Sequence, residues 1–287
     1  MEKIGIIGYG NLGAAIAQGL KDKYVVGVYD KDQNKITALK NITAANNSGE
    51  LVKQSEVIIL AVKPQDFGIL LNEIKPFVEN KLLISIAAGI TSGYIKNILG
   101  KIRIVRCMPN IAVKILEGET SICSDGDAQE SDLVFVRKIF NLLGKTWEIK
   151  EEMLDAVTAI SGSGPAYILY AMEINKLDPL NIPREFERAW IHSLKEAALE
   201  VGIDWEMASD LAASTTASTI HFVKQTGNLP LELRKMITSA GGTTEAALKV
   251  ITNGGSWSEA AVAAKQRARE LSIKACLPAA RSRQTRS

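Results

Sequence analysis

The sequence has little of the chemistry that metal sites and nucleic-acid surfaces need. Its 287 residues include only two histidines, His192 and His221, and three widely separated cysteines that form no CxxC pair. No zinc-ligand spacing results, so no metal is expected, and the cysteines should be small buried hydrophobes. The 34 basic and 32 acidic residues leave a net charge of +2. This near balance argues against nucleic acid as the main partner.

Long apolar runs are also missing. The longest, Val57–Val62, is far shorter than the roughly 20 residues that span a bilayer. The N-terminal Met1–Gly8 leads directly into a glycine-rich turn and lacks the basic start and cleavage site of a secretory signal. We therefore expect a cytoplasmic protein that does not enter the membrane. The chain length suits two compact domains.

The first half alternates short runs of Ile, Val and Leu with amphipathic segments. This pattern predicts a Rossmann-like, doubly wound parallel sheet with helices on both faces, which is an α/β domain. The expected strands are Ile4–Ile7, Tyr24–Tyr29, Val57–Ala61, Leu82–Ile86 and Ile102–Arg106, with short ones at Ser121–Cys123 and Thr146–Ile149. The expected helices are Leu12–Lys21, Asp32–Leu39, Gln65–Phe77, Ser92–Leu99 and Asp132–Leu143.

From Met153 onward the pattern becomes helical, which predicts an all-α C-terminal domain. Ala, Leu, Glu and Lys dominate the segments Phe186–Val201, Trp205–Gln225, Thr244–Ile251 and Ser258–Ser272. We expect a dinucleotide-binding domain at 1–152, a helical domain at 153–276 and a flexible basic tail at 277–287.

The segment Gly8-Tyr9-Gly10-Asn11-Leu12-Gly13 fits GxGxxG between a predicted strand and a predicted helix. In such a turn Gly8 allows the tight bend, Gly10 lets the backbone approach a pyrophosphate, and Gly13 lets the helix pack on the strand. The pyrophosphate then lies at the helix N-terminus, where Asn11 and Leu12 begin the helix. The strand–turn–helix context makes this a prediction of dinucleotide binding, which the glycines alone would not support.

Asp30 ends the second predicted strand, roughly 20 residues beyond the glycines, where a carboxylate binds the ribose hydroxyls of NAD. The extra phosphate of NADP would be repelled there, although Lys31 and Lys35 offset that repulsion. Asp30 also fits a simple helix N-cap. The cofactor is therefore NADPH or NADH, with NADH slightly favoured.

Two further turns follow strand ends, where ligands gather in doubly wound sheets. Ala61, Val62, Lys63 and Pro64 close one strand, and Lys63 is placed to reach a phosphate or ribose. The sequence Met108-Pro109-Asn110 follows another, and we expect it to contact nicotinamide or substrate. Taken alone, both are ordinary turns.

Several separated segments resemble the pyrroline-5-carboxylate reductase family, in order from Met1 to about Leu271. They are Ile4–Gly13, Leu60–Gln65, Ile84–Ile90, Arg106–Asn110, Leu154–Tyr167 and Leu233–Thr244. The resemblance implies reduction of 1-pyrroline-5-carboxylate, a cyclic imine acid, to L-proline by NAD(P)H, the last step of proline biosynthesis. It also implies dimers formed through the helical domain, and rings of dimers.

The resemblance also implies a substrate site. Ser161, Ser163 and Gly164 would form one small-residue loop, and Gly241, Gly242, Thr243 and Thr244 would form another. Such loops offer N–H groups and hydroxyls to a carboxylate. Thr244 would also act at the reacting bond, by hydrogen-bonding the ring nitrogen. Read alone, these two segments are typical of a linker and a helix N-cap.

The chain departs from the family in two places. Ala240 stands where the family usually has proline, and the stretch between Tyr167 and Gly202 is longer by roughly 18 residues, more than a typical connection. The extra segment, around 174–192, contains Pro179 and Pro183, which should break the helix. The sequence does not decide whether it is a loop, a helix or a partner surface.

Three alternatives remain. A β-hydroxyacid-type dehydrogenase shares the scaffold but places a catalytic lysine soon after its glycines, and here no lysine follows Gly164 before Lys176. A related cyclic imine, such as the six-membered homologue, is a second possible substrate. A non-catalytic dinucleotide-binding sensor is the third, since fold alone does not fix function.

Overall fold

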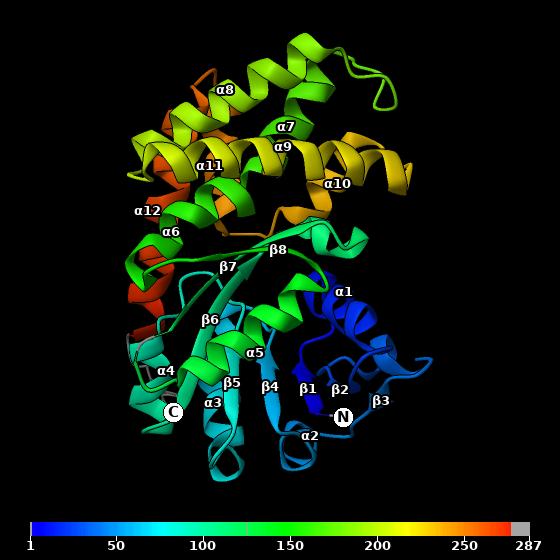
Figure 1. Cartoon of the computed structure of the whole chain (residues 1–287), viewed down its shortest axis with the longest axis vertical. Helices are drawn as coiled ribbons and strands as arrows, with labels where there is room; N and C mark the ends of the chain where they lie inside the picture. The colour runs from blue at the N-terminus through cyan, green and yellow to red at the C-terminus, as the bar shows by residue number, and fades with distance from the viewer. Residues whose placement is uncertain (1, 125, 277–287) are drawn as a thin grey trace, which may run out of the picture.

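The computed structural model describes residues 2–124 and 126–276, and it places an α/β half beside a helical half (Figure 1). The first half contains an eight-stranded sheet in the order β3-β2-β1-β4-β5-β6-β7-β8. Its strands are β1 Lys3–Ile7, β2 Val25–Tyr29, β3 Thr43–Ala44, β4 Val57–Leu60, β5 Leu82–Ser85, β6 Arg103–Pro109, β7 Gly118–Ser124 and β8 Gly144–Glu148. The expected Rossmann-like architecture is confirmed.

Helices cover both faces of this sheet because its strands carry apolar side chains on both sides. Ile4 and Ile6 of β1 belong to an apolar core that includes α1 Asn11–Leu20 and α5 Glu130–Asn141. Ile7 belongs to the core of the opposite face, with α2 Ser48–Gln54, α3 Phe67–Ile74 and α4 Ser92–Leu99. The strand order reverses between β1 and β4, so their carboxyl ends form the crevice where ligands bind in this fold.

The structure corrects two expectations. The sheet is mostly, not wholly, parallel, because β7 runs antiparallel to β6. Only the short 3-10 turn Ile111–Ile115 lies between these strands in the chain, and a parallel pairing would need a longer crossover. The expected helix Asp32–Leu39 is only the 3-10 turn Gln33–Ile36. Ile36 is its one buried residue, and beside it only Leu39 of the expected helix packs on the core, so the apolar contact that would hold a helix is small.

After β8 every regular element in the described part of the chain is helical. These elements are α6 Leu154–Val157, α7 Gly164–Ile174, α8 Arg184–Glu200, α9 Trp205–Thr226, α10 Pro230–Ile237, α11 Thr243–Thr252 and α12 Trp257–Cys276. The predicted break is confirmed: α7 ends at Ile174 and α8 starts only after Pro183. The predicted tail at 277–287 lies outside the described residues. No helix among those described is long and apolar enough to cross a membrane.

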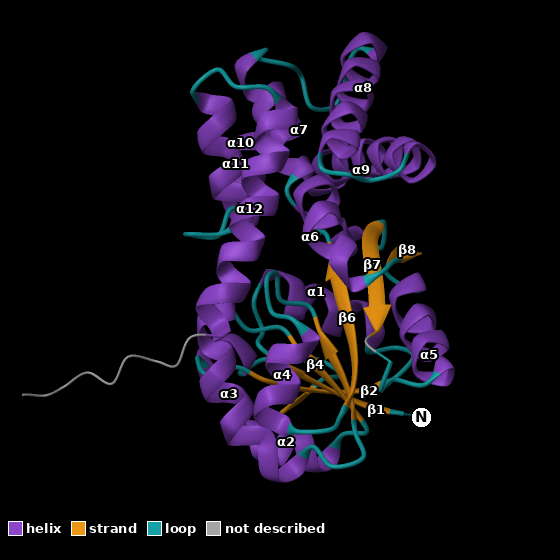
Figure 2. Ribbon diagram, turned by 90° about the vertical axis from the view of Figure 1, so that its left-hand side faces the viewer, coloured by secondary structure: helices purple, strands orange, loops and turns teal. Residues whose placement is uncertain are grey.

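The long helix α12 links the two halves, and it runs from the helical part down beside the sheet (Figure 2). Gly89, in the turn after β5, has φ +74°, and a Cβ atom there would lie 2.7 Å from the Leu271 Cβ and 2.8 Å from the Ala268 carbonyl oxygen. The absence of a side chain at Gly89 therefore lets the backbone of α12 touch the α/β half.

Candidate active site

The glycine-rich turn has the geometry that close approach to a dinucleotide requires. Gly8 has φ +102°, and a Cβ there would lie 2.6 Å from the Ala61 carbonyl oxygen. A Cβ on Gly13 would lie 2.0 Å from the Gly8 carbonyl oxygen, so α1 packs tightly against the turn. A Cβ atom added to Gly10 would have no neighbour within 4 Å, and no side chain caps α1. The N-terminus of α1 is therefore open to an anion.

Asp30 is buried beside this turn and both of its carboxylate oxygens accept hydrogen bonds. Oδ2 accepts from the Tyr9 backbone N–H at 2.7 Å, and Oδ1 accepts from the Asp32 N–H at 2.9 Å and from Lys35 Nζ at 3.2 Å. Burial alone would raise the pKa of Asp30, but these donors outweigh it and hold the pKa below its ordinary value. Asp30 is thus a fixed negative charge at the end of β2.

A cleft of about 410 Å³ lies between the carboxyl ends of the strands and helices α10 and α11. It brings together three of the four segments that the sequence singled out around the cofactor, without Asp30, and the substrate loop Gly241–Thr244. The predicted residues that line it are Gly10, Asn11, Leu12, Ala61, Val62, Lys63, Pro64, Met108, Pro109, Asn110, Gly241, Gly242, Thr243 and Thr244. Gly8, Gly13, Asp30, Ser161, Ser163 and Gly164 do not line it.

Ser163 of the second predicted loop reaches the cleft indirectly, through hydroxyl groups. Thr244 Oγ1 donates to Ser163 Oγ at 3.2 Å, and Ser163 Oγ lies 3.2 Å from Thr243 Oγ1. All three residues are buried. Ser161 instead donates to the Val157 carbonyl within its own helix, and Gly164 packs against Leu194. The two loops are therefore joined at Ser163.

The segment before α7 is a π-helical turn, Thr158–Gly162, which the sequence did not predict. Thr158 and Gly162 both line the cleft, and π turns occur often at functional sites. A π turn contains one more residue than an α-helical turn, and the spacing of apolar residues in the sequence does not reveal it. The cleft also contains residues that sequence reasoning missed: Gln65, Ile86, Ala87, Ala88, Ile111, Met236, Ile237, Ser239, Ala240 and Leu271. The position of Ile86–Ala88 after β5 was the available signal for three of them.

Asn110 carries an unused donor in this cleft. Its side chain is 2% exposed, and its Oδ1 accepts from the N–H groups of Ala112 and Glu119, both at 3.1 Å. Its Nδ2 is buried and has no partner among the described residues. A buried donor of this kind normally has an acceptor, and a bound amide or carboxylate would supply one.

The fold and this cleft define a class: an oxidoreductase that uses a nicotinamide dinucleotide and combines a Rossmann-like half with a helical half. The turn at α1, the unsatisfied Asn110 donor and the space before Gly10 fit such a cofactor. Comparison with known protein families supports the same class. Residues 3–89 match a family model described as NADP oxidoreductase coenzyme F420-dependent, and residues 188–271 match one described as Pyrroline-5-carboxylate reductase dimerisation.

Relatives narrow the class to one family. The chain is 34% identical to the pyrroline-5-carboxylate reductase of Methanosarcina acetivorans, over 85% of this chain and 87% of the relative. It is 32% identical to that of Arabidopsis thaliana, over 94% and 95%. A crystal structure of Plasmodium falciparum pyrroline carboxylate reductase with NADP bound is 28% identical, with a TM-score of 0.61 over 94% of this chain and 98% of that one. The chain belongs to the pyrroline-5-carboxylate reductase family.

Proposed function

We propose that the protein reduces the C=N bond of 1-pyrroline-5-carboxylate with NAD(P)H and releases L-proline. The observation that carries the proposal is the cleft that joins the dinucleotide turn at Gly10 to the loop Gly241–Thr244. Membership of the family supplies the substrate class. We assign cofactor binding to residues 1–152 and substrate binding with self-association to residues 153–276.

The N-terminus of α11 is suited to the substrate carboxylate. The first N–H groups of a helix have no partner within it, and no side chain caps α11 at Gly242. The N–H groups of Thr243 and Thr244 are thus available to an anion, and the helix dipole favours negative charge there. Met108, Met236 and Ile237 give the cleft an apolar lining that excludes water.

Thr244 would hold the ring nitrogen. Its hydroxyl proton is directed at Ser163 Oγ, so its oxygen is left as an acceptor for the N–H of a protonated imine. A bound dihydronicotinamide supplies the hydride. A protonated imine is already electrophilic, so the task of these residues is to align the ring carbon. Such a step needs no histidine or lysine acid.

We further infer a preference for NADH over NADPH. Three donors hold the Asp30 carboxylate in place, and it keeps its charge. It would therefore stay in position and repel a ribose phosphate. Lys35 neutralises part of that charge from one side, which makes the preference modest.

Self-association through the helical half has structural support. Ile174, Leu180, Trp205 and Leu229 are each more than half exposed there, and a second subunit would bury apolar surface of this kind. We propose a dimer, assembling into a ring of dimers. Cys107 and Cys123 are buried and are not joined by a disulfide, which fits a reducing compartment, and we infer a cytoplasmic location.

A spectrophotometric assay tests the reaction. Purified protein is mixed with pyrroline-5-carboxylate and either NADH or NADPH, and absorbance loss is followed for the wild type, Thr244→Ala and Thr244→Ser. Oxidation that falls at least tenfold in Thr244→Ala and survives in Thr244→Ser supports the proposal. Cofactor binding without oxidation would instead favour the sensor. Activity on a 2-hydroxy acid would favour the β-hydroxyacid-type dehydrogenase, and faster turnover of the six-membered imine would reassign the substrate.

A further inference from the structure

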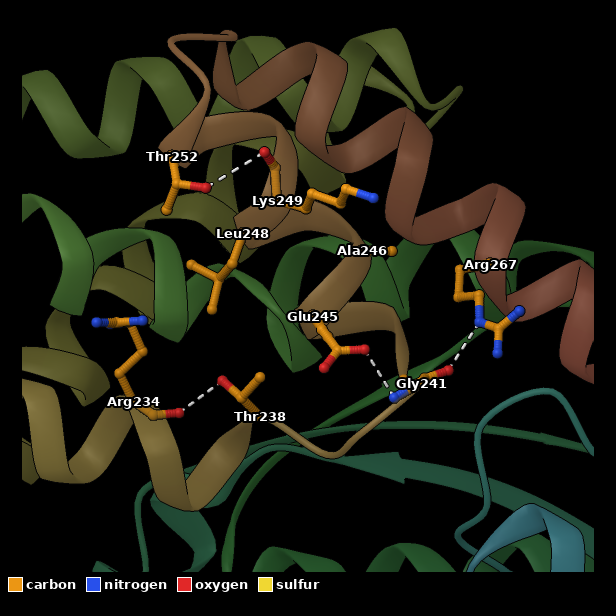
Figure 3. Close-up of a pocket in the computed structure, with 10 residues that line it drawn as sticks. Arg234, Thr238, Gly241, Glu245, Ala246, Leu248, Lys249, Thr252 and Arg267 are labelled. Carbon is orange, nitrogen blue, oxygen red and sulfur yellow. Dashed lines mark hydrogen bonds between the residues drawn. The ribbon is translucent and has the colours of Figure 1, made fainter.

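Both backbone polar groups of Gly241 are held by charged side chains (Figure 3). Its N–H donates to Glu245 Oε2 at 2.8 Å, and its carbonyl oxygen accepts from Arg267 Nε at 2.7 Å. Glu245 lies in the first turn of α11, whereas Arg267 comes from α12. Hydrogen bonds to ionised groups are about twice as strong as neutral ones. The Gly241 peptide is therefore fixed from two helices.

Gly241 needs this support because of its conformation. It has φ +69°, in the left-handed region, and it lies in the connection between α10 and α11. Glycine is flexible there in the absence of partners. Because Gly241 directly precedes Gly242 and Thr243, its backbone angles set where the N-terminus of α11 enters the cleft.

Arg267 and Glu245 together form a clamp on the Gly241 peptide, and Arg267 has a further partner. Arg267 Nη1 donates to Glu270 Oε2 at 2.9 Å, which orients the guanidinium while Nε faces Gly241. A cavity of about 650 Å³ adjoins the loop on this side, and Lys249 and Arg234 line it together with Arg267. For Lys249 the structure records no side-chain bond to the loop, so its charge can be removed without touching Gly241.

We propose that Arg267 and Glu245 are positioning residues, which hold Gly241 in its left-handed conformation and thereby place Thr243 and Thr244 against the substrate. This inference rests on the proposed reductase function. Neither residue lines the cleft. Their effect is geometric, and a displacement of about 1 Å at a reacting centre can lower the rate by roughly a hundredfold.

The test compares variants on both sides of the clamp. Arg267→Met removes the donor, and Arg267→Lys restores one. Glu245→Ala removes the acceptor, and Glu245→Gln retains a neutral one. Lys249→Gln is the matched control, because it takes a positive charge from the same cavity. The measurements are kcat and KM for pyrroline-5-carboxylate, the Kd for NADH, and hydrogen–deuterium exchange of the peptide spanning Ser239–Thr244.

We expect Arg267→Met and Glu245→Ala to lower kcat/KM for the imine by about ten- to a hundredfold, with NADH binding unchanged. Arg267→Lys and Glu245→Gln should recover at least part of the loss. Lys249→Gln should behave as wild type. Exchange at Ser239–Thr244 should accelerate at least tenfold in the two disrupting variants alone.

Two results would overturn the inference. One is activity and exchange in Arg267→Met and Glu245→Ala that match Lys249→Gln. The other is an equal loss in Arg267→Met and Lys249→Gln, which would point to the positive charge of the cavity. If the wild type shows no imine reduction, the proposed function fails, but the exchange measurement still decides whether the clamp orders the loop. If Arg267→Met does not fold, the Glu245 pair carries the test.

Discussion

Asn11 and Met236 are 225 residues apart in the chain, and the side-chain amide of Asn11 donates to the Met236 carbonyl oxygen at 3.0 Å. Lys114 Nζ reinforces the junction, because it contacts Asn11 Oδ1 at 3.3 Å and Met236 Sδ at 3.1 Å. Asn11 begins the dinucleotide helix, and Met236 lies near the end of α10, shortly before the substrate loop. The cofactor turn is thus joined across the cleft to helix α10, which leads into the substrate loop.

The first prediction concerns this junction. Asn11→Ala should raise the KM for the imine about fivefold, because one exposed hydrogen bond contributes about 1 kcal/mol. The control is Asn72→Ala, since Asn72 is also exposed and donates to a backbone carbonyl, that of Gly68, but within α3. Steady-state kinetics on both variants checks the prediction. Equal KM values for the two variants would contradict it.

The second prediction concerns the buried hydroxyls. Ser163→Ala removes the acceptor of Thr244 Oγ1, so the Thr244 hydroxyl becomes free to rotate. We expect kcat to fall about tenfold, and the double variant with Thr244→Ala should lose less than the product of the single losses, since the residues act as a unit. A double-mutant cycle on kcat measures this coupling. Strictly multiplicative losses would show that Ser163 and Thr244 act independently.

The third prediction concerns cofactor choice. Asp30→Asn keeps a side-chain oxygen for one of the backbone donors and removes the negative charge that faces a ribose phosphate. The ratio of kcat/KM for NADPH to that for NADH should rise about tenfold or more, because each 1.36 kcal/mol changes a ratio tenfold. Asp66→Asn, which removes an acid paired with Lys31, is the control. An unchanged ratio in Asp30→Asn would remove Asp30 as the basis of selectivity.

The fourth prediction concerns pH. Burial raises the pKa of Glu119 above its ordinary value, against the opposing effect of Trp147, Ser214 and Lys145. Below the unfolded pKa, about 4.3, Glu119 is protonated in both states. Above the raised folded pKa, the ionised carboxylate makes folding less favourable than it is for a neutral side chain.

Glu119→Gln should therefore raise the thermal midpoint more at pH 8 than at pH 4, by about 2–4 °C. The glutamine retains an oxygen for the Trp147 indole N–H. Thermal melts of wild type and variant at both pH values measure the difference. Glu148→Gln, at an exposed ion pair with Arg137, should show no comparable dependence. The same shift at both pH values would rule out ionisation of Glu119 as the cause.

Much of the α/β half was predictable, because its buried parallel strands are continuous apolar runs. The strand β7 was predicted too short, at Ser121–Cys123, since its Glu119 and Thr120 are polar yet buried. Burial of polar groups erases the hydrophobic signal by which a strand is found. The antiparallel direction of β7 also depends on a turn that apolar periodicity does not describe.

The site was predictable where it follows local rules and hidden where it depends on distant contacts. The glycines of the turn, Asp30 and the strand ends follow from the geometry of the fold. The bonds of Asn11 to Met236 and of Arg267 to Gly241 join distant parts of the chain, and the residues next to Asn11 or Arg267 in sequence do not indicate these partners. Such pairs become visible only when the halves are packed together.

Helix α12 touches both sides of the cleft within one turn. Arg267 holds the Gly241 loop, and Leu271, four positions later on the same helical face, lies against Gly89 and lines the cleft. The rise of one helical turn, about 5.4 Å, thus sets the spacing between the substrate loop and the sheet. Inserting a single residue between these two positions would rotate one contact by about 100° relative to the other. The number of residues between Arg267 and Leu271 therefore helps to determine the geometry of the active site.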